Sequence, residues 1–166
     1  MEQDAIETQP QLKWLRSKAI ETGSIEGVEY CICKSPGYDK GYGGLNGYAI
    51  FLEKPVKEPN YDGILTYVPV HGGITYCEHE PSASIYGFDT GHYGSESVPR
   101  FDPAWVKGQI GLMVLALKLA ATLEDKYLAA EDDNEARAKI AQRVMDLSPE
   151  EGFSFGVMIN LLSGQL

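Results

Sequence analysis

The order of apolar and polar residues divides the chain into a strand-rich middle part flanked by helices. Apolar residues alternate with polar ones, or run together, in short segments bounded by turn-forming residues, which is typical of strands. The pattern predicts four strands, at residues 27–34, 47–53, 65–71 and 83–89, with a short fifth at 74–77. Pro69 lies inside the third segment, which places that strand at a sheet edge or marks a bulge.

A helix is predicted before the strands. Leu12 and Leu15 lie on one face of a helix that begins at Pro10, a residue suited to the first helical position, and extends to about Ile20. Gly23 ends this N-terminal helical region, which spans residues 10–22.

A long helix is predicted after the strands. Asp102 is a good N-cap residue and Pro103 a good first helical residue. The apolar run over residues 104–123 is long enough to span a membrane, but it contains Lys107 and Lys118. The pattern therefore favours a core helix that packs on the sheet.

The remainder of the chain keeps a helical period. Residues 124–143 are rich in charge and contain Asp-Asp-Asn at 132–134, either a turn between two helices or an exposed face. Residues 148–151, Ser-Pro-Glu-Glu, form a capping box that opens a last helix. Its apolar side favours packing within the monomer, with a homo-oligomer contact through the C-terminal helices as the alternative.

Together these elements predict an α+β fold in a single domain of residues 1–166. An antiparallel sheet of four or five strands, within the Gly/Tyr-rich residues 27–94, packs against the long helix. Additional N- and C-terminal helices come from residues 10–22 and 102–164.

Charge and cysteine content limit the classes of function. The formal net charge of −10 argues against a basic surface for a phosphate backbone, so we expect no direct nucleic-acid binding. The three cysteines are an odd number, and the first residues lack the basic and apolar regions of a secretory signal. We therefore expect free thiols, no membrane association and a cytoplasmic location.

Two glycine-rich segments place histidines at the ends of predicted strands. One contains His71 followed by Gly72 and Gly73, and the other contains Asp89 and His92. If the segments are neighbours, the side chains meet either as a base oriented by a carboxylate or as two imidazoles and a carboxylate around a metal. The structural alternative is that the aspartate caps a turn and the histidines bond loop carbonyls.

The loop at residues 37–48, GYDKGYGGLNGY, is a further candidate. Its tyrosines offer flat faces, Lys40 a positive charge and its glycines free N–H groups, which suits a nucleotide-like ligand. A flexible hairpin loop is the alternative. The residues expected to bind a ligand are Tyr38, Lys40, Tyr42, Tyr48, His71, Gly72, Gly73, Thr75, Asp89 and His92.

Four blocks of sequence resemble a family of small proteins encoded by bacteria and their phages. The blocks are GLNGYAIFLEKP (44–55), NYDGILTYVPVHGGITY (60–76), YGFDTGHYGS (86–95) and FDPAWVKGQIGLMVLALKL (101–119). The family pattern contains VHGG[IL]TY and GFDxxHxG, the latter often followed by Asp where this chain has Ser95. The shared positions are Tyr61, Asp62, His71, Gly72, Gly73, Gly87, Phe88, Asp89, His92 and Gly94.

The resemblance implies relatives without implying a reaction. A phage setting, and a site rich in Gly, Tyr and His without a complete catalytic set, predict a non-enzymatic binding protein that needs no cofactor or metal. As a phage or mobile-element anti-defence factor, it would sequester a nucleotide-like signal molecule.

Two alternatives stay open. In the first, the protein is a hydrolase of a nucleotide or similar ester, with or without a metal, in which His71, Asp89 and His92 act as base, orienting group or metal ligands. In the second, it is an acidic inhibitor that blocks a host defence protein with the charged segment 124–135, for which a solvated helix face is the structural alternative.

Overall fold

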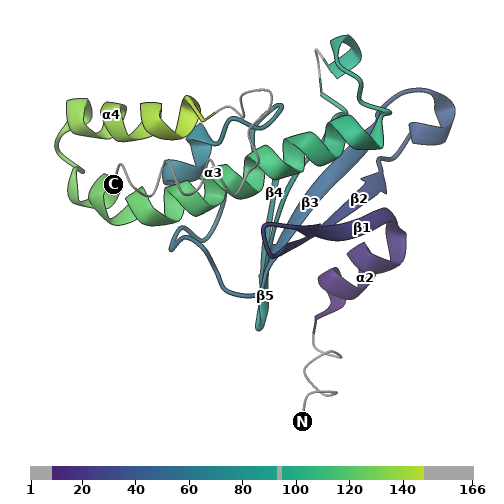
Figure 1. The fold of residues 1–166 in the computed structure, drawn as a ribbon, viewed down its shortest axis with the longest axis horizontal. Coiled ribbons are helices and arrows are strands. Elements are labelled where there is room, and N and C mark those ends of the chain that lie inside the picture. The colour runs from purple at the N-terminus through teal and green to yellow at the C-terminus, as the bar shows by residue number, and fades with distance from the viewer. Residues whose placement is uncertain (1–8, 93–94, 148–166) are drawn as a thin grey trace.

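The computed structural model describes residues 9–92 and 95–147, and it confirms the α+β class. Five antiparallel strands form one sheet in the order β1-β2-β3-β5-β4 (Figure 1). The helices and strands are α2 (Pro10–Lys18), β1 (Ala19–Ile25), β2 (Val28–Lys34), β3 (Leu45–Phe51), β4 (Tyr76–Glu80), β5 (Ala83–Phe88), α3 (Pro103–Ala129) and α4 (Asn134–Met145).

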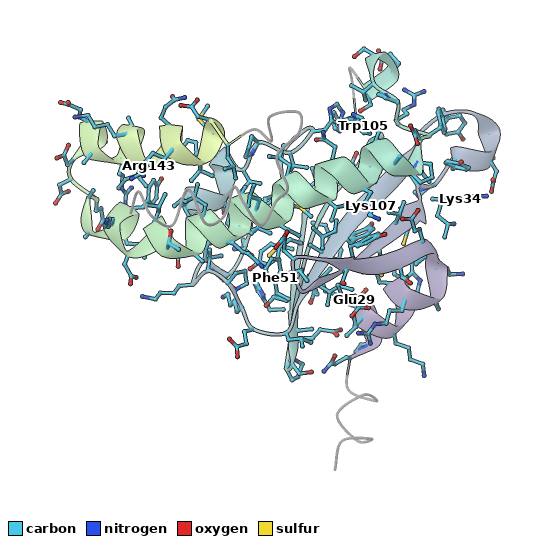
Figure 2. The ribbon with its side chains drawn as sticks, in the orientation of Figure 1. Glu29, Lys34, Phe51, Trp105, Lys107 and Arg143 are labelled. Atoms are coloured by element: carbon cyan, nitrogen blue, oxygen red, sulfur yellow. The ribbon has the colours of Figure 1, made fainter. Side chains whose placement is uncertain are left out.

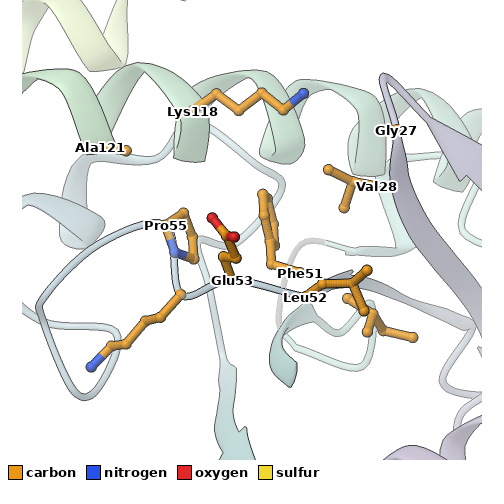
Figure 3. Close-up of a pocket in the computed structure, with 10 residues that line it drawn as sticks. Gly27, Val28, Phe51, Leu52, Glu53, Pro55, Lys118 and Ala121 are labelled. Atoms are coloured by element: carbon orange, nitrogen blue, oxygen red, sulfur yellow. The ribbon is translucent and has the colours of Figure 1, made fainter. Parts of the chain in front are cut away.

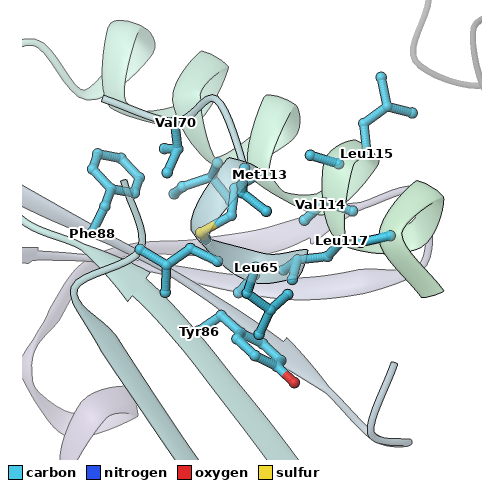
Figure 4. Close-up of a cluster of buried hydrophobic side chains, with 14 of the residues drawn as sticks. Leu65, Val70, Tyr86, Phe88, Met113, Val114, Leu115 and Leu117 are labelled. Carbon is cyan, nitrogen blue, oxygen red and sulfur yellow. The ribbon is translucent and has the colours of Figure 1, made fainter. Parts of the chain in front are cut away.

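The sheet is covered on both faces. Helix α3 crosses one face, and α4 returns along the C-terminal half of α3 (Figure 1). Side chains from this face and from α3 form the main core, which includes Leu65, Tyr86, Phe88, Met113 and Leu117 (Figure 4). The short α2 covers part of the other face, where a smaller buried cluster lies. The alternation of strand side chains between the two faces therefore separates the two clusters.

The start of α3 agrees with the sequence prediction, and the start of α4 decides between the two alternatives left open for residues 132–134. The Asp102 carboxylate accepts a hydrogen bond from the backbone N–H of Ala104 at 2.9 Å, and Pro103 follows as the first helical residue. Asp133 caps α4 in the same way, by accepting from the N–H of Ala136 at 3.0 Å. The segment 132–134 is thus a turn between two helices.

The predicted end of the first helix is wrong. The helix stops at Lys18 rather than near residue 20 or 22, and the chain continues directly into β1. Strand β1 joins β2 through Glu26 and Gly27, both with positive φ (49° and 76°), as in the tight turns that suit antiparallel hairpins. Pairing β1 with β2 along its whole length stabilises the chain more than a longer helix would, because only two leucines of that helix are buried.

The predicted strand over residues 65–71 is also wrong. Residues Gly63–Tyr67 form a 3-10 helix, and the rest of the segment is a loop. The N–H of Leu65 bonds the carbonyl of Asp62 and the N–H of Val68 bonds the carbonyl of Leu65, so the backbone is satisfied locally. Pro69 lacks the N–H that a strand ladder needs.

One further predicted strand has different bounds in the structure, and the predicted last helix lies outside the described residues. Strand β4 covers residues 76–80 rather than 74–77, and its turn to β5 is only Pro81 and Ser82. The last helix, and with it the homo-oligomer contact, lies in residues 148–166, outside the described part of the chain.

One described helix, α3, is long and apolar enough by length and composition to cross a membrane. In its most apolar window, 61% of the residues are buried inside the protein, against the sheet and α4. The core helix of a soluble protein has the same properties.

Candidate functional site

The loops at one end of the sheet carry the candidate side chains. Because neighbouring strands are antiparallel, the ends of β2 and β5 and the beginnings of β3 and β4 lie at the same end of the sheet. Helix α3 begins at this end too, as the labelled side chains of Trp105 and Lys34 show (Figure 2). The fold therefore brings the segments 35–44, 71–75 and 89–92 to one side of the molecule.

His71, Asp89 and His92 come together at this end. The imidazole rings of His71 and His92 stack, with their centroids 4.7 Å apart and their planes 26° apart. Nδ1 of His92 lies 3.3 Å from Oδ1 of Asp89. The side chains of His92 and Asp89 are 33% and 38% exposed, so a solute can reach both.

The Asp89 carboxylate is fixed by its own loop. Its Oδ1 accepts a hydrogen bond from the N–H of Gly91 at 2.9 Å, and the N–H of Asp89 donates to Oγ1 of Thr75 at 3.2 Å. Burial by itself would raise the pKa of Asp89, but hydrogen bonds from Gly91, Thr75 and His92 hold it below its usual value. Asp89 is therefore ionised at neutral pH and acts only as an acceptor.

The protonation of Asp89 determines which nitrogen of His92 is free. An ionised carboxylate accepts but cannot donate, so Nδ1 of His92 carries the proton that points to Asp89. In the neutral ring, Nε2 of His92 is then left with its lone pair. The site thus offers a carboxylate acceptor and an oriented imidazole side by side.

His71 is held from three sides. Its Nε2 lies 3.0 Å from the hydroxyl of Ser95, and its backbone N–H donates to Oε1 of Gln109 at 3.0 Å. The edge of Trp105 meets its ring at a centroid distance of 5.4 Å. Burial, and then the nearby His92, lower the pKa of His71 below its usual value. His71 is therefore neutral at physiological pH.

The two glycines after His71 have different roles. Gly72 and Gly73 both have positive φ (73° and 78°), which glycine adopts at little cost. A Cβ atom on Gly72 would collide with the ring of His92, whereas one on Gly73 would meet nothing within 4 Å. Gly72 therefore makes room for the stacked imidazole.

The tyrosines of the 37–48 loop do not join this group. Tyr38 packs edge-on against Phe101 at 5.4 Å, and Tyr42 is exposed and covers Gly37. Tyr48 packs against Tyr76 at 5.5 Å on the α2 side of the sheet. Within residues 9–92 and 95–147, no hydrogen bond or ring contact links these tyrosines, or the exposed Lys40, to the two histidines.

The base of the same loop does reach the strand end beside Asp89. The side-chain oxygen of Asn46 accepts from the N–H of Thr90 at 3.4 Å, and the Thr90 hydroxyl donates to the carbonyl of Leu45 at 3.0 Å. Gly44 lies against Thr90 and Arg100, with no room for a side chain. The single pocket expected from the sequence is therefore two neighbouring clusters, one of histidines and one of aromatic and basic residues.

Sequence reasoning missed several residues of the site. Ser95, Gln109 and Trp105 contact His71, and Arg100 lies beside Thr90. Ser95 is fully buried, and it occupies the position where the family pattern often has Asp. The difference between Ser95 and the Asp of that pattern was the only feature of the sequence that pointed to this position. Nothing in the local pattern marked the others, because their partners are distant in sequence.

The cysteines lie away from this site. Cys31 and Cys33 are buried in the cluster under α2, and burial raises their pKa to about 12 and about 11. Cys77 has its Sγ 3.5 Å from Nε2 of His79, and burial raises its pKa to about 11. All three are protonated at neutral pH. Among the described residues, no group of three or more His, Cys, Asp or Glu is placed to hold a metal ion.

A hollow lies elsewhere on the molecule, between the end of β3 and α3 (Figure 3). It has a volume of about 420 Å³, and its lining includes Val28, Phe51, Glu53 and Lys118. The Lys118 ammonium donates to the carbonyl of Glu26 at 2.7 Å. No candidate residue from the sequence lies in it.

The acidic segment 124–135 is only partly a surface feature. Glu124 is 4% exposed, and its two carboxylate oxygens accept from the N–H groups of Lys57 (2.5 Å) and Glu58 (3.1 Å). Asp125 and residues 131–135 are exposed. Glu124 therefore anchors the 52–62 loop and is not available to a partner.

Comparison of the chain with protein-family models, with curated proteins and with solved structures gave no match.

Proposed function

We propose that the protein binds a small nucleotide-like molecule, without turning it over, at the site formed by His71, Asp89 and His92. The observation that carries this proposal is the stacked imidazole pair held against an ionised carboxylate at a solvent-accessible loop.

The hydrogen-bonding groups of this site suit the edge of a nucleobase. Asp89 is an acceptor, and Nε2 of His92 accepts in the neutral ring and donates in the charged ring. The His92 side chain is 33% exposed, so part of it can contact a ligand. A base edge presents donors and acceptors a few ångströms apart, so it can satisfy both side chains at once.

The positions of the nucleophiles favour binding over catalysis. The Ser95 hydroxyl is fully buried and already faces His71, so it cannot attack a substrate from the solvent side. The described thiols are protonated and lie away from the site. The described site residues thus include a base, and the exposed hydroxyl beside it, that of Thr75, is engaged with the backbone N–H of Asp89.

The wider form of the proposal is a role in anti-defence. The resemblance to phage-associated proteins motivates it, and a binding site without turnover suits a protein that withdraws a signal molecule from its receptor. The cytoplasm is the compartment where such a molecule is found.

Native mass spectrometry of the protein purified without added ligand tests the binding proposal. We expect a mass above that of the chain, and this excess should be lost on denaturation. The released compound should have the absorbance of a nucleobase. The His92→Ala variant should lose this mass, while His79→Gln, on the edge strand β4, should retain it. A ligand that is bound equally by His92→Ala, or a chain mass alone even with an excess of each common ribonucleoside, would contradict the proposal.

The hydrolase alternative has one specific observation in its favour. A histidine whose Nδ1–H is held by an ionised aspartate is oriented as a general base, with Nε2 free to accept a proton from water. Incubation with ribonucleoside phosphates, followed by chromatography, distinguishes the two functions. A binding protein returns its ligand intact, whereas a hydrolase yields product at a rate that falls in Asp89→Asn.

A further inference from the structure

Arg100 is a half-buried cation whose guanidinium Nε makes no hydrogen bond within the described part of the chain. Its Nε is buried and no acceptor lies within reach. A guanidinium has five N–H donors and cannot lose its charge at any physiological pH. An unmet, permanently charged donor of this kind favours an anionic acceptor from outside the protein.

Arg137 is an arginine of the same protein whose Nε does have a hydrogen-bond acceptor. Its guanidinium lies over the ring of Tyr127 at 4.5 Å, much as that of Arg100 lies over Phe101 at 5.1 Å. The Nε of Arg137, however, donates to the carbonyl of Tyr127 at 3.1 Å. The two arginines share the aromatic contact and differ in whether Nε has an acceptor.

The neighbours of Arg100 are aromatic and basic. Phe101 is 41% exposed and packs edge-on against Tyr38. The ammonium of Lys34 lies over the ring of Tyr38, 4.8 Å from its centroid. Lys40 is exposed in the same loop. In a chain with a net charge of −10, this region brings together Lys34, Lys40 and Arg100, of which Lys34 pairs with Asp39.

Three acids near this cluster have other partners. Asp39 pairs with Lys34 at 2.9 Å, and Asp102 caps the first turn of α3. Asp89 accepts from Gly91 and faces His92. None of these three carboxylates bonds Arg100, so its guanidinium can meet an anionic ligand.

The fold places Arg100 beside the histidine cluster. The stem of Arg100 packs on Gly44, where an added Cβ would lie 3.0 Å from the Cβ of Arg100 and would collide with the hydroxyl of Thr90. Thr90 directly follows Asp89 in the chain. The stem of Arg100 therefore lies close to the loop that carries Asp89 and His92.

We infer that Arg100 binds a phosphate group of the ligand, so that the ligand class is a nucleoside phosphate with its base at His92 and its phosphate at Arg100. The inference rests on the proposed function for the position of the base. Asp89 would repel a phosphate at the histidines, which leaves Arg100 as the anion-binding end. The planar fork of arginine matches two phosphate oxygens at once.

NMR titration of the whole protein, with the Nε–H signals of Arg100 and Arg137 and the ring signals of His92 as reporters, tests this inference. Inorganic phosphate should shift the Arg100 signal saturably and leave Arg137 unmoved. Adenosine should shift His92 alone, and adenosine 5′-monophosphate should shift both Arg100 and His92. Arg100→Gln should weaken binding of the monophosphate roughly 10- to 100-fold, as for a lost charge-assisted contact, and should leave adenosine binding unchanged. Arg137→Gln is the matched control and should bind both compounds normally.

The outcomes separate the two proposals. If the monophosphate shifts His92 while Arg100 does not respond, the inference is wrong and the proposed function stands. If phosphate shifts Arg100 while no nucleoside or nucleotide shifts His92, Arg100 is an anion site and the proposed function is wrong. Equal shifts of Arg100 and Arg137 would show only the general effect of added salt, and would overturn the inference.

Discussion

At the scale of single residues, the paired glycines after His71 provide a matched comparison. We expect Gly72→Ala to displace the ring of His92, because the added Cβ would collide with it, and to abolish ligand binding. Gly73→Ala should cost only the strain of a positive φ, about 1 kcal/mol, and should keep the site. Urea unfolding measures the stability, and the NMR signals of His92 report the ring position. Equal effects of the two substitutions on those signals would contradict the role given to Gly72.

The lowered pKa of His71 predicts how stability depends on pH. Burial and His92 disfavour the charged ring in the folded state, whereas the unfolded chain takes up the proton near the usual value of 6.5. The unfolded state therefore binds more protons as the pH falls through this range, so the free energy of unfolding decreases from about pH 7 to about pH 5. The His71→Asn variant should show a shallower decrease in urea titrations over the same range, since His79, whose pKa is also lowered, still contributes. An unchanged slope would contradict the assignment.

The sequence identified the members of the histidine cluster, because each lies near glycines in a segment that was predicted to end a strand. It did not identify Arg100 or Gln109. Arg100 stands out only because its Nε lacks a hydrogen-bond acceptor. Gln109 lies 38 positions from His71, whose backbone N–H donates to its side chain. Neither property has a local pattern.

At the scale of elements, the buried carboxylate of Glu124 links α3 to the 52–62 loop. The Glu124→Ala variant leaves two backbone N–H groups without their acceptor, so we expect a loss of about 2–3 kcal/mol in the free energy of unfolding. Asp125→Asn removes only an ion pair with Lys57 between side chains that are 72% and 78% exposed, and should change stability by less than about 0.5 kcal/mol. Urea unfolding of both variants checks this contrast. A comparable loss in each would contradict the anchoring role.

Strands and helices were predicted where side chains alternate strongly or where a cap is encoded. Strands β2 and β5 and the start of α3 were found in this way. Strand β1 was missed because Gly23 and Ser24 resemble the end of a helix, whereas the glycine in fact makes room for the ring of Tyr30. The strand predicted around Pro69 failed because its apolar residues are buried by a 3-10 turn and a loop. Whether such a segment forms a strand depends on the strand it pairs with, and that partner can lie far away in the sequence.

At the scale of the whole molecule, α3 is the element that the sheet and α4 share. Leu117 is fully buried in this helix, and Leu128 is 49% exposed. We expect Leu117→Ala to lower the free energy of unfolding by about 2–5 kcal/mol, and Leu128→Ala by less than about 0.5 kcal/mol. Thermal or urea unfolding compares the two leucines on one helix. Similar small losses would show that α3 is not packed as described.

The acidic charge of the whole chain conceals opposite local charges. The histidine site contains an ionised carboxylate, while the neighbouring cluster contains Lys34, Lys40 and Arg100. A ligand that carries both a hydrogen-bonding ring and an anionic group matches this arrangement better than a simple anion or a neutral ring. This match is the physical content of the nucleotide proposal.

The fluorescence of Trp105 tests the central claim most directly. The chain has two tryptophans, and Trp14 is 53% exposed on α2, so Trp14→Phe leaves Trp105 as a reporter in contact with His71. We predict that at least one of the four common ribonucleoside monophosphates changes this fluorescence saturably, and that the change is lost when His71 and His92 are both replaced by alanine. Fluorescence that none of the four alters, or a change that persists without both histidines, would contradict the account.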